Sequence, residues 1–275
     1  MAAHASTSEP RAASSGVGDR RAAGARLGPV DGRVDGWEYN SQAPMPGYST
    51  VLFDLDGTLI DSTELIMTSF RHTMRTHLDA VPSEAEWRSG FGTPLRPQLA
   101  RFARDAAEVE VMVETYRSCQ RLYHDRLVSA FPDIVRVVAR LAASQIPLAI
   151  VTSKNREATL HGLRHCGLEA YFDVVVTSDD VTRHKPEPAP VIEALARLDR
   201  PAHGTLFIGD SPFDCMAGHA AGVSTAAVRW GPFARAELER HEPDHWLERP
   251  ADILDLTDSE PTPLGRSVSG VEDGS

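Results

Sequence analysis

The feature that most constrains the fold is an apolar run at residues 51–53 that ends abruptly in two carboxylates. Such a run predicts a buried strand of a parallel sheet. Asp54 and Asp56 are two residues apart, so on a continuing strand they would point the same way, and Gly57 then allows a sharp turn. Two carboxylates at the carboxyl end of a parallel strand indicate either a bound cation or two separate acid and base roles. The alternative is an ordinary Asp-Gly turn.

Length and charge limit the classes of function. A chain of 275 residues is long enough for one good-sized domain, or for one domain with a smaller one inserted. Its formal net charge of −11 argues against nucleic acid as the main partner. No apolar run approaches the roughly 20 residues of a membrane helix, so no membrane association is expected. The three cysteines (Cys119, Cys166 and Cys215) are an odd number and well separated, which favours a reducing, cytoplasmic location.

The two ends of the chain differ in composition from its middle. Residues 1–47 are rich in Ala, Gly, Ser and Arg and have almost no large apolar side chain before Trp37, so this N-terminal extension is expected to be disordered. Met45 lies just before the first strand and is a candidate for the native start. Residues 257–275 are polar and slightly acidic, and a disordered tail is expected there.

Residues 62–131 show only helical patterns. Ile66, Phe70 and Met74 fall on one helical face, and a second long helix is predicted around Tyr116. Asp61 precedes the first of these helices as a capping residue. No strand signal interrupts the segment, which therefore reads as a small helical cap domain inserted into a sheet domain.

Strands and helices alternate from residue 132 to residue 256. Strands are expected at 146–151, 172–176, 204–208, 223–228 and 244–247, and helices at 134–143 and 251–256 among others. This alternation predicts an α/β fold, a doubly wound parallel sheet formed by residues 48–61 and 132–256. Ligands bind at the carboxyl ends of the strands in such sheets.

Polar residues follow several of these predicted strands. Thr152 and Ser153 end one strand, where a hydroxyl and the backbone of a starting helix can hold a phosphoryl oxygen. Lys185, before Pro186 at the expected start of a helix, can neutralise a carboxylate or a transferring phosphoryl group. Asp210 leaves the next strand beside Asp54 if the sheet is parallel. Each has a structural alternative: a strand-ending hydroxyl, or a solvated lysine.

These clusters, in this order, resemble the four signatures of the haloacid dehalogenase superfamily, in its phosphoglycolate phosphatase and pyrophosphatase branch with a helical cap. The resemblance implies that Asp54 is the nucleophile and Asp56 the general acid and base. It implies that Mg²⁺ is held by Asp54, the Asp56 carbonyl and Asp210. Thr152 and Lys185 would then hold the phosphoryl oxygens, with Ser153 beside them.

Other residues enter through the same resemblance. Asp214 would lie next to the metal ligands, although Ser211 and Asp214 also form a possible capping box. A loop at residues 89–96 corresponds to one that faces the active site in relatives with helical caps. Thr93 and Arg96 are therefore candidates for substrate contact, and an exposed arginine is the alternative.

The resulting hypothesis is a Mg²⁺-dependent phosphatase that hydrolyses a small phosphorylated metabolite through an aspartyl-phosphate, as a monomer or a homodimer. Phosphoglycolate, pyrophosphate, a sugar phosphate and a nucleoside monophosphate all remain open as substrates. A phosphosugar mutase is the second hypothesis, because it uses the same two aspartates, although it usually has Val where Thr58 stands. A catalytically idle ligand-binding protein is the third.

Two other activities of the superfamily are disfavoured by the sequence. A dehalogenase would lack Asp56, and a phosphonatase would need a cap lysine, which residues 62–131 do not contain. His161 and His165 are four apart on a predicted helix and could share a metal ion, but the sequence offers them no evident partner ligands, so they are interpreted as surface histidines.

Overall fold

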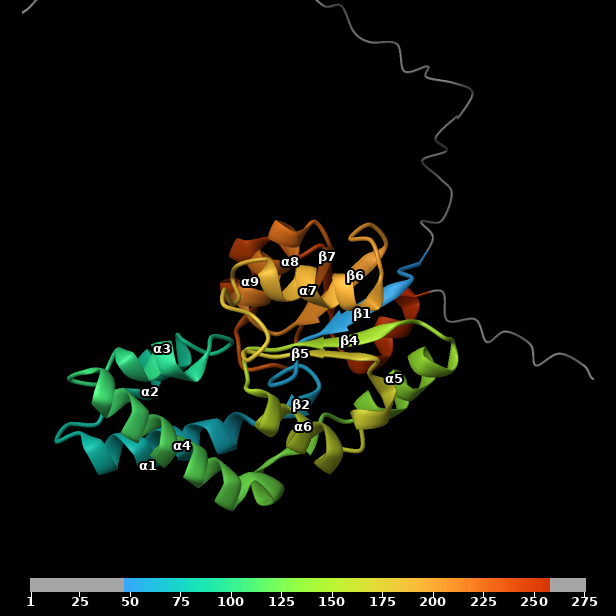
Figure 1. Ribbon diagram of the computed structural model, residues 1–275. Coiled ribbons are helices and arrows are strands. Elements are labelled where there is room, and N and C mark those ends of the chain that lie inside the picture. The colour runs from blue at the N-terminus through green and yellow to red at the C-terminus, as the bar shows by residue number, and fades with distance from the viewer. Residues whose placement is uncertain (1–46, 258–275) are drawn as a thin grey trace, which may run out of the picture. The chain divides into compact units, whose positions relative to one another are not determined.

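The computed structural model describes residues 47–257 (Figure 1). The predicted disordered extension, the start at Met45 and the tail from residue 258 onward lie outside the described residues. Thr257, expected in the tail, is instead buried and bridges Tyr48. Within residues 47–257, no helix combines the length and the apolar character that crossing a membrane would require.

A six-stranded parallel sheet forms the centre of the fold, in the order β5-β4-β1-β6-β7-β8. This confirms the predicted doubly wound α/β class, and each strand ends within one residue of the expected position. The strands are β1 (Thr50–Phe53), β4 (Leu148–Val151), β5 (Val174–Val176), β6 (Thr205–Gly209), β7 (Ser224–Val228) and β8 (His245–Leu247).

Helices cover both faces of the sheet because side chains alternate along each strand. Val51 and Phe53 of β1 belong to one apolar cluster, and Leu52 between them belongs to the other. The first cluster includes α5 (Ile134–Ala143), α6 (Arg156–His165) and the 3₁₀ helix η3 (Pro250–Leu256). The second includes α7 (Ala189–Leu198) and α8 (Pro212–Ala221), and Figure 1 shows these two helix sets on opposite sides of the strands. Short connections add η1 (Glu169–Tyr171), α9 (Arg235–Leu238) and η2 (Glu239–His241).

The segment expected to be helical contains α1 (Thr63–His77), α2 (Glu84–Arg88), α3 (Leu95–Ala100) and α4 (Ala106–Leu127). These helices have an apolar cluster of their own, in which Phe70 stacks on Trp87 with ring centroids 4.8 Å apart. The expectation that no strand interrupts residues 62–131 was wrong at one place. β2 (Ile60–Asp61) pairs antiparallel with β3 (Ser129–Ala130), where the chain enters and leaves the helical segment. Two-residue strands are too short to leave a hydrophobic pattern.

Two predicted helix starts also differ. Asp61 does accept a hydrogen bond from the backbone of Thr63, but Ser62, the residue at the cap position, directs its hydroxyl to Asp56 instead of the helix. Lys185 does not begin a helix, because α7 starts at Ala189 after a turn through the Pro-rich stretch. That turn leaves the lysine side chain free to point back toward the sheet.

Candidate active site

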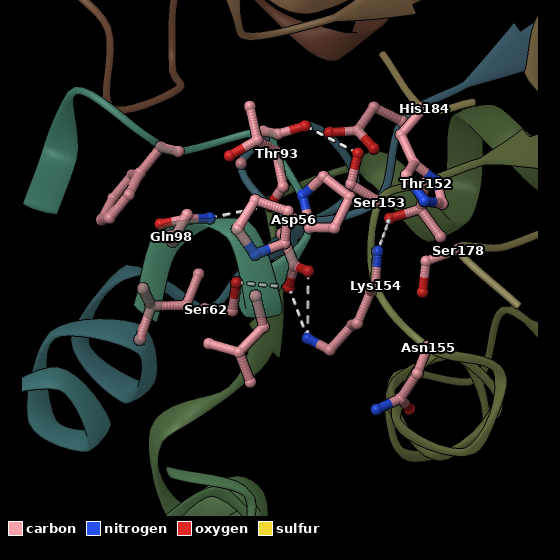
Figure 2. A pocket seen from close by; sticks show the side chains of 18 of the residues that line it. Asp56, Ser62, Thr93, Gln98, Thr152, Ser153, Lys154, Asn155, Ser178 and His184 are labelled. Atoms are coloured by element: carbon pink, nitrogen blue, oxygen red, sulfur yellow. Dashed lines mark hydrogen bonds and ion pairs between the residues drawn. The ribbon is translucent and has the colours of Figure 1, made fainter. Parts of the chain in front are cut away.

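A cavity of about 410 Å³ lies at the carboxyl ends of the central strands (Figure 2). Asp54 follows β1, Thr152 follows β4, and Asp210 follows β6, so three neighbouring strands each contribute a polar side chain. The parallel register of β1 with β4 and β6 brings these strand ends to one edge. Residues 91–98 of the helical segment, with Tyr116, Arg117 and Gln120 of α4, line another part of the wall.

A buried ionic cluster forms the floor of this cavity. Lys185 Nζ donates to Asp54 Oδ1 at 2.9 Å and to Asp214 Oδ1 at 2.6 Å. The other oxygen of Asp214 accepts hydrogen bonds from the backbone and the hydroxyl of Ser211 at the start of α8, so the expected capping box is present. Asp210 accepts a hydrogen bond from the Thr58 hydroxyl at 3.0 Å, through Oδ1. Both oxygens of Asp214 are thus engaged by the protein, whereas Oδ2 of Asp210 is not held by a side chain of the described residues.

Burial and mutual repulsion shift the pKa values of these groups. Burial raises the pKa of Asp54 to about 7, because its effect is larger than the opposing attraction of Lys185. The charge of Asp214 adds to the rise. Burial together with the charges of Asp54 and Asp214 raises the pKa of Asp210 well above its usual range. Burial alone would lower the pKa of Lys185, but Asp214 and Asp54 hold it above its usual range, so the lysine stays charged.

The charge balance of this cluster fits a divalent cation. Three buried carboxylates, on Asp54, Asp210 and Asp214, face the single positive charge of Lys185, and their oxygens lie within 4.8 Å of one another. Ionising all three leaves an excess of two negative charges, which a divalent ion would neutralise. Gly57 supports the close approach: its φ is +84°, and a Cβ there would lie 2.6 Å from the Asp210 carboxyl carbon. Carboxylate donors of this kind suit a hard divalent ion.

Asp56, the second predicted catalytic carboxylate, lies in the same cavity but outside the buried cluster. Lys154 Nζ lies 2.7 Å from its Oδ1 and 3.0 Å from its Oδ2, and the Ser62 hydroxyl donates to Oδ1 at 2.6 Å (Figure 2). The turn at Gly57 separates the environments of the two aspartates. Asp54 is surrounded by buried charges, and Asp56 faces the open part of the cavity.

The residues predicted to hold phosphate are placed differently from one another. Thr152 is buried beside Asp54 and lines the cavity. Ser153 also lines it, but its hydroxyl donates to the carbonyl oxygen of Gly92 at 2.7 Å. Gly92 lies in the loop between α2 and α3, has a φ of +87°, and would place a Cβ 2.7 Å from the Ser211 hydroxyl. The loop of the helical segment therefore closes directly onto the strand ends.

Thr93 and Arg96, the predicted substrate-contact residues of this loop, both line the cavity. The Thr93 hydroxyl donates to the carbonyl oxygen of Gly90 within its own loop. Arg96 forms an ion pair with Glu110 of α4 and is more than half exposed. The structure brings both residues to the cavity without leaving the charge of Arg96 unpaired.

Sequence reasoning missed several cavity residues, and three of them bear directly on the chemistry of the site. They are Lys154, which holds Asp56; Arg117 on α4; and His184, whose buried Nδ1 has no hydrogen-bond partner among the described residues. Within residues 47–257 Arg117 forms no ion pair, and its Nε is buried without a partner. A signal for Arg117 existed, because it follows the buried Val113 by one helical turn on an apolar face. The chain has only two lysines, Lys154 and Lys185, and both are in this site.

Known proteins share this architecture. The pyrophosphatase PpaX of Bacillus mycoides is 38% identical over 76% of this chain and 96% of its own length. A relative from Caldanaerobacter subterraneus subsp. tengcongensis, also assigned to pyrophosphatase PpaX, is 42% identical over 73% of this chain and 90% of its own. Among solved structures, a haloacid dehalogenase-like hydrolase from Streptococcus pneumoniae has a TM-score of 0.65 at 27% identity, covering 75% of this chain and 98% of that one.

A family model agrees with these similarities. Residues 51–228 match the model described as haloacid dehalogenase-like hydrolase. This range runs from β1 through β7 and includes every predicted site residue from Asp54 to Asp214. The protein therefore belongs to the haloacid dehalogenase-like hydrolase family, in the branch that contains phosphatases.

Proposed function

We propose that the protein is a Mg²⁺-dependent phosphatase that cleaves pyrophosphate, or a small phosphomonoester of similar charge, through a phosphorylated Asp54. The observation that carries the proposal is the buried cluster in which three carboxylates face one lysine. Such a cluster has an excess of two negative charges when it is fully ionised, and a divalent cation would neutralise this excess. The likeness to pyrophosphatases named PpaX ranks pyrophosphate first among the substrates.

The cavity supports an anionic substrate of small size. Its volume of about 410 Å³ suits a small metabolite, and its lining includes the cationic side chains of Lys154 and Arg117. With the transferring phosphoryl group at Asp54, the second phosphate or the carboxylate of the substrate would point toward these two cations. Phosphoglycolate satisfies the same charges and is the next candidate.

The residues then divide the chemistry as follows. The Asp54 carboxylate attacks phosphorus and the bond to the leaving oxygen breaks, while Asp56 gives that oxygen a proton. Asp56 next takes a proton from water, which attacks the phosphorus of phospho-Asp54 and releases inorganic phosphate. Lys185 and Thr152 hold the phosphoryl oxygens during both steps.

Mg²⁺ bound by Asp54 and Asp210, with the backbone carbonyl of Asp56, would supply the positive charge that offsets the developing negative charge on the phosphoryl oxygens. Asp214 orients Lys185 and Ser211 instead of binding the ion, because both of its oxygens are already engaged.

The proposed organisation includes a cap domain at residues 62–131 on a core of residues 48–61 and 132–256. The separate apolar cluster of α1–α4 and the β2–β3 pair at the base of this segment support that division. A cytoplasmic location is part of the same proposal, supported by three free cysteines.

The Thr58 hydroxyl bears on the choice between a phosphatase and a phosphosugar mutase. It hydrogen-bonds Asp210, a contact that the Val usual in those mutases could not make. The phosphatase is therefore preferred.

Phosphate release from a panel of substrates tests the proposal. Pyrophosphate, phosphoglycolate, glucose 1-phosphate and a nucleoside monophosphate would each be assayed with Mg²⁺ and with EDTA. We expect pyrophosphate to have the highest kcat/KM, and EDTA to abolish release. If no compound released phosphate from the folded, Mg²⁺-supplied protein, the phosphatase would be excluded. Interconversion of glucose 1-phosphate and glucose 6-phosphate would then point to the mutase.

Replacing Arg117 with Met is expected to raise KM for pyrophosphate by about tenfold or more, because a hydrogen bond to a charged group contributes roughly 1.5–3 kcal/mol. Arg96→Met is the matched control, and its effect should be smaller because Arg96 is paired with Glu110 and largely exposed. Steady-state kinetics of both variants provide the comparison. A larger effect at Arg96 than at Arg117 would reverse their assigned roles.

A further inference from the structure

Three histidines and an aspartate lie close together where the end of α4 packs against α6. His124 and Asp125 come from the end of α4, and His161 and His165 come from one face of α6. Asp125 Oδ1 lies 2.8 Å from His124 Nδ1, 3.0 Å from His161 Nε2 and 3.6 Å from His165 Nδ1. The sequence offered His161 and His165 no partner ligands, whereas the structure brings His124 and Asp125 of α4 beside them. Both histidines are partly exposed, as expected of surface residues. We call these four residues the histidine cluster.

A hydrogen bond to the backbone orients the His165 ring. A carbonyl oxygen only accepts, so His165 Nε2 must be the donor in its 3.2 Å contact with the Val128 carbonyl. The other nitrogen, Nδ1, is then left facing the carboxylate of Asp125. Metal-binding histidines are usually held in this way, with one nitrogen donating to a carbonyl and the other facing the ion.

The His124 ring is buried, and its Nε2 has no hydrogen-bond partner among the described residues. Its ring stacks on that of His161, with ring centroids 4.1 Å apart, so the two imidazoles from α4 and α6 are in direct contact.

We propose that the histidine cluster binds a transition-metal ion of the Zn²⁺ class, at a site separate from the carboxylate site in the cavity. Zn–N and Zn–O bonds of about 2.0–2.1 Å in a tetrahedron place ligand atoms about 3.3 Å apart. One ligand atom from each of His124, Asp125 and His161 lies within 4.8 Å of the other two, and the separations from Asp125 Oδ1 are 2.8 and 3.0 Å. His165 Nδ1 lies farther out, 3.6 Å from the same oxygen. Imidazole donors beside one carboxylate favour Zn²⁺, Co²⁺ or Ni²⁺ over Mg²⁺.

Access and charge are both compatible with this ion. Asp125 is largely exposed and His161 is partly exposed, which gives an entry path from solvent. Lys154 lines the same pocket as His124 and His161, and its positive charge would oppose a metal ion. Asp56 offsets that charge through its contact with Lys154.

The position of the site gives it a structural consequence. α4 ends at Leu127, immediately before β3, where the chain leaves the helical segment. A metal ion bound by His124 and His161 would tie α4 to α6, which packs on the sheet. The site would thus fix the base of the helical segment relative to the sheet, and metal binding should raise thermal stability.

Cobalt spectroscopy and thermal unfolding test the proposal. Metal-free protein would be titrated with Co²⁺ in excess Mg²⁺, which occupies the carboxylate site. We expect one equivalent of Co²⁺ to give the intense visible absorption of a tetrahedral site, and Zn²⁺ to displace it. Saturating Zn²⁺ should raise Tm by about 5 °C or more, the shift expected at about 100 times Kd.

Two variants make the test specific. His161→Ala should abolish the cobalt spectrum and the Tm rise while leaving the metal-free Tm nearly unchanged, because this side chain is 42% exposed. His203→Ala, at an exposed histidine outside the cluster, should retain both signals. Absence of a tetrahedral spectrum in the wild type, or its persistence in His161→Ala, would overturn the proposal. Neither outcome depends on phosphatase activity.

Discussion

Asp54→Asn is expected to lower phosphate release by more than about 10³-fold, the scale on which loss of an essential nucleophile acts. The amide cannot attack phosphorus, and Lys185, Thr152 and the metal ligands cannot replace the missing bond. The free energy of unfolding of Asp54→Asn should be unchanged or higher than that of the wild type. Asp54 is one of three buried carboxylates around a single lysine, so a neutral side chain removes like-charge repulsion while Asp214 still pairs with Lys185.

Asp180→Asn provides the matched control for this variant. Asp180 accepts hydrogen bonds from Arg156 at 2.6 Å and from Arg197 at 3.1 Å, and it lies outside the cavity. Its replacement should cost about 2 kcal/mol of unfolding free energy and leave kcat nearly intact. Steady-state kinetics and urea titration of both variants would give opposite patterns. Substantial turnover by purified Asp54→Asn would disprove the assignment of the nucleophile.

Lys185→Met is expected to destabilise the protein by about 3–5 kcal/mol, the cost of leaving a buried charge without its partner. The lysine is 3% exposed and contacts both Asp54 and Asp214, so its loss leaves the carboxylates of the cluster facing one another. Urea unfolding in EDTA measures this cost without the offsetting effect of a metal ion. Activity should fall as well, because the phosphoryl group loses its buried cation.

A double variant keeps this prediction testable if the single one does not fold. Lys185→Met/Asp214→Asn removes one negative charge with the positive one and should recover part of the lost stability. Lys154→Met is the control at the other lysine, and it should cost less because its partner Asp56 is partly exposed. Equal losses at the two lysines would contradict the argument from burial.

The strand ends were predictable because each buried strand leaves a continuous apolar run that stops where the polar residues begin. The positions of Asp54, Thr152 and Asp210 at one edge of the sheet therefore follow from the order of these runs along the chain. Lys185 reaches the same edge for a partly different reason than expected: it precedes α7 by a turn instead of starting the helix. The local sequence pattern was therefore sufficient to predict that Lys185 reaches the active site, but not the backbone conformation that brings it there.

Residues that depend on packing between distant elements were not predictable. Ser62 occupies the cap position of α1, yet its hydroxyl donates to Asp56 and not to the helix. Arg117 and Lys154 lie 37 positions apart and share the cavity only after α4 packs near the strand ends. The histidine cluster is the clearest example, since the i, i+4 pair on α6 becomes a possible metal site only when α4 adds His124 and Asp125.

The placement of both lysines beside the aspartates of the site gives the protein a built-in spectroscopic reporter. Their side chains are 9% and 1% exposed, and the chain has no other lysine. Selective isotopic labelling of lysine would give NMR signals from two residues, one touching Asp54 and the other touching Asp56. Acylation of lysine could occur at only these two side chains, both almost fully buried, so a loss of activity that accompanies lysine acylation would trace to one of two known Nζ atoms.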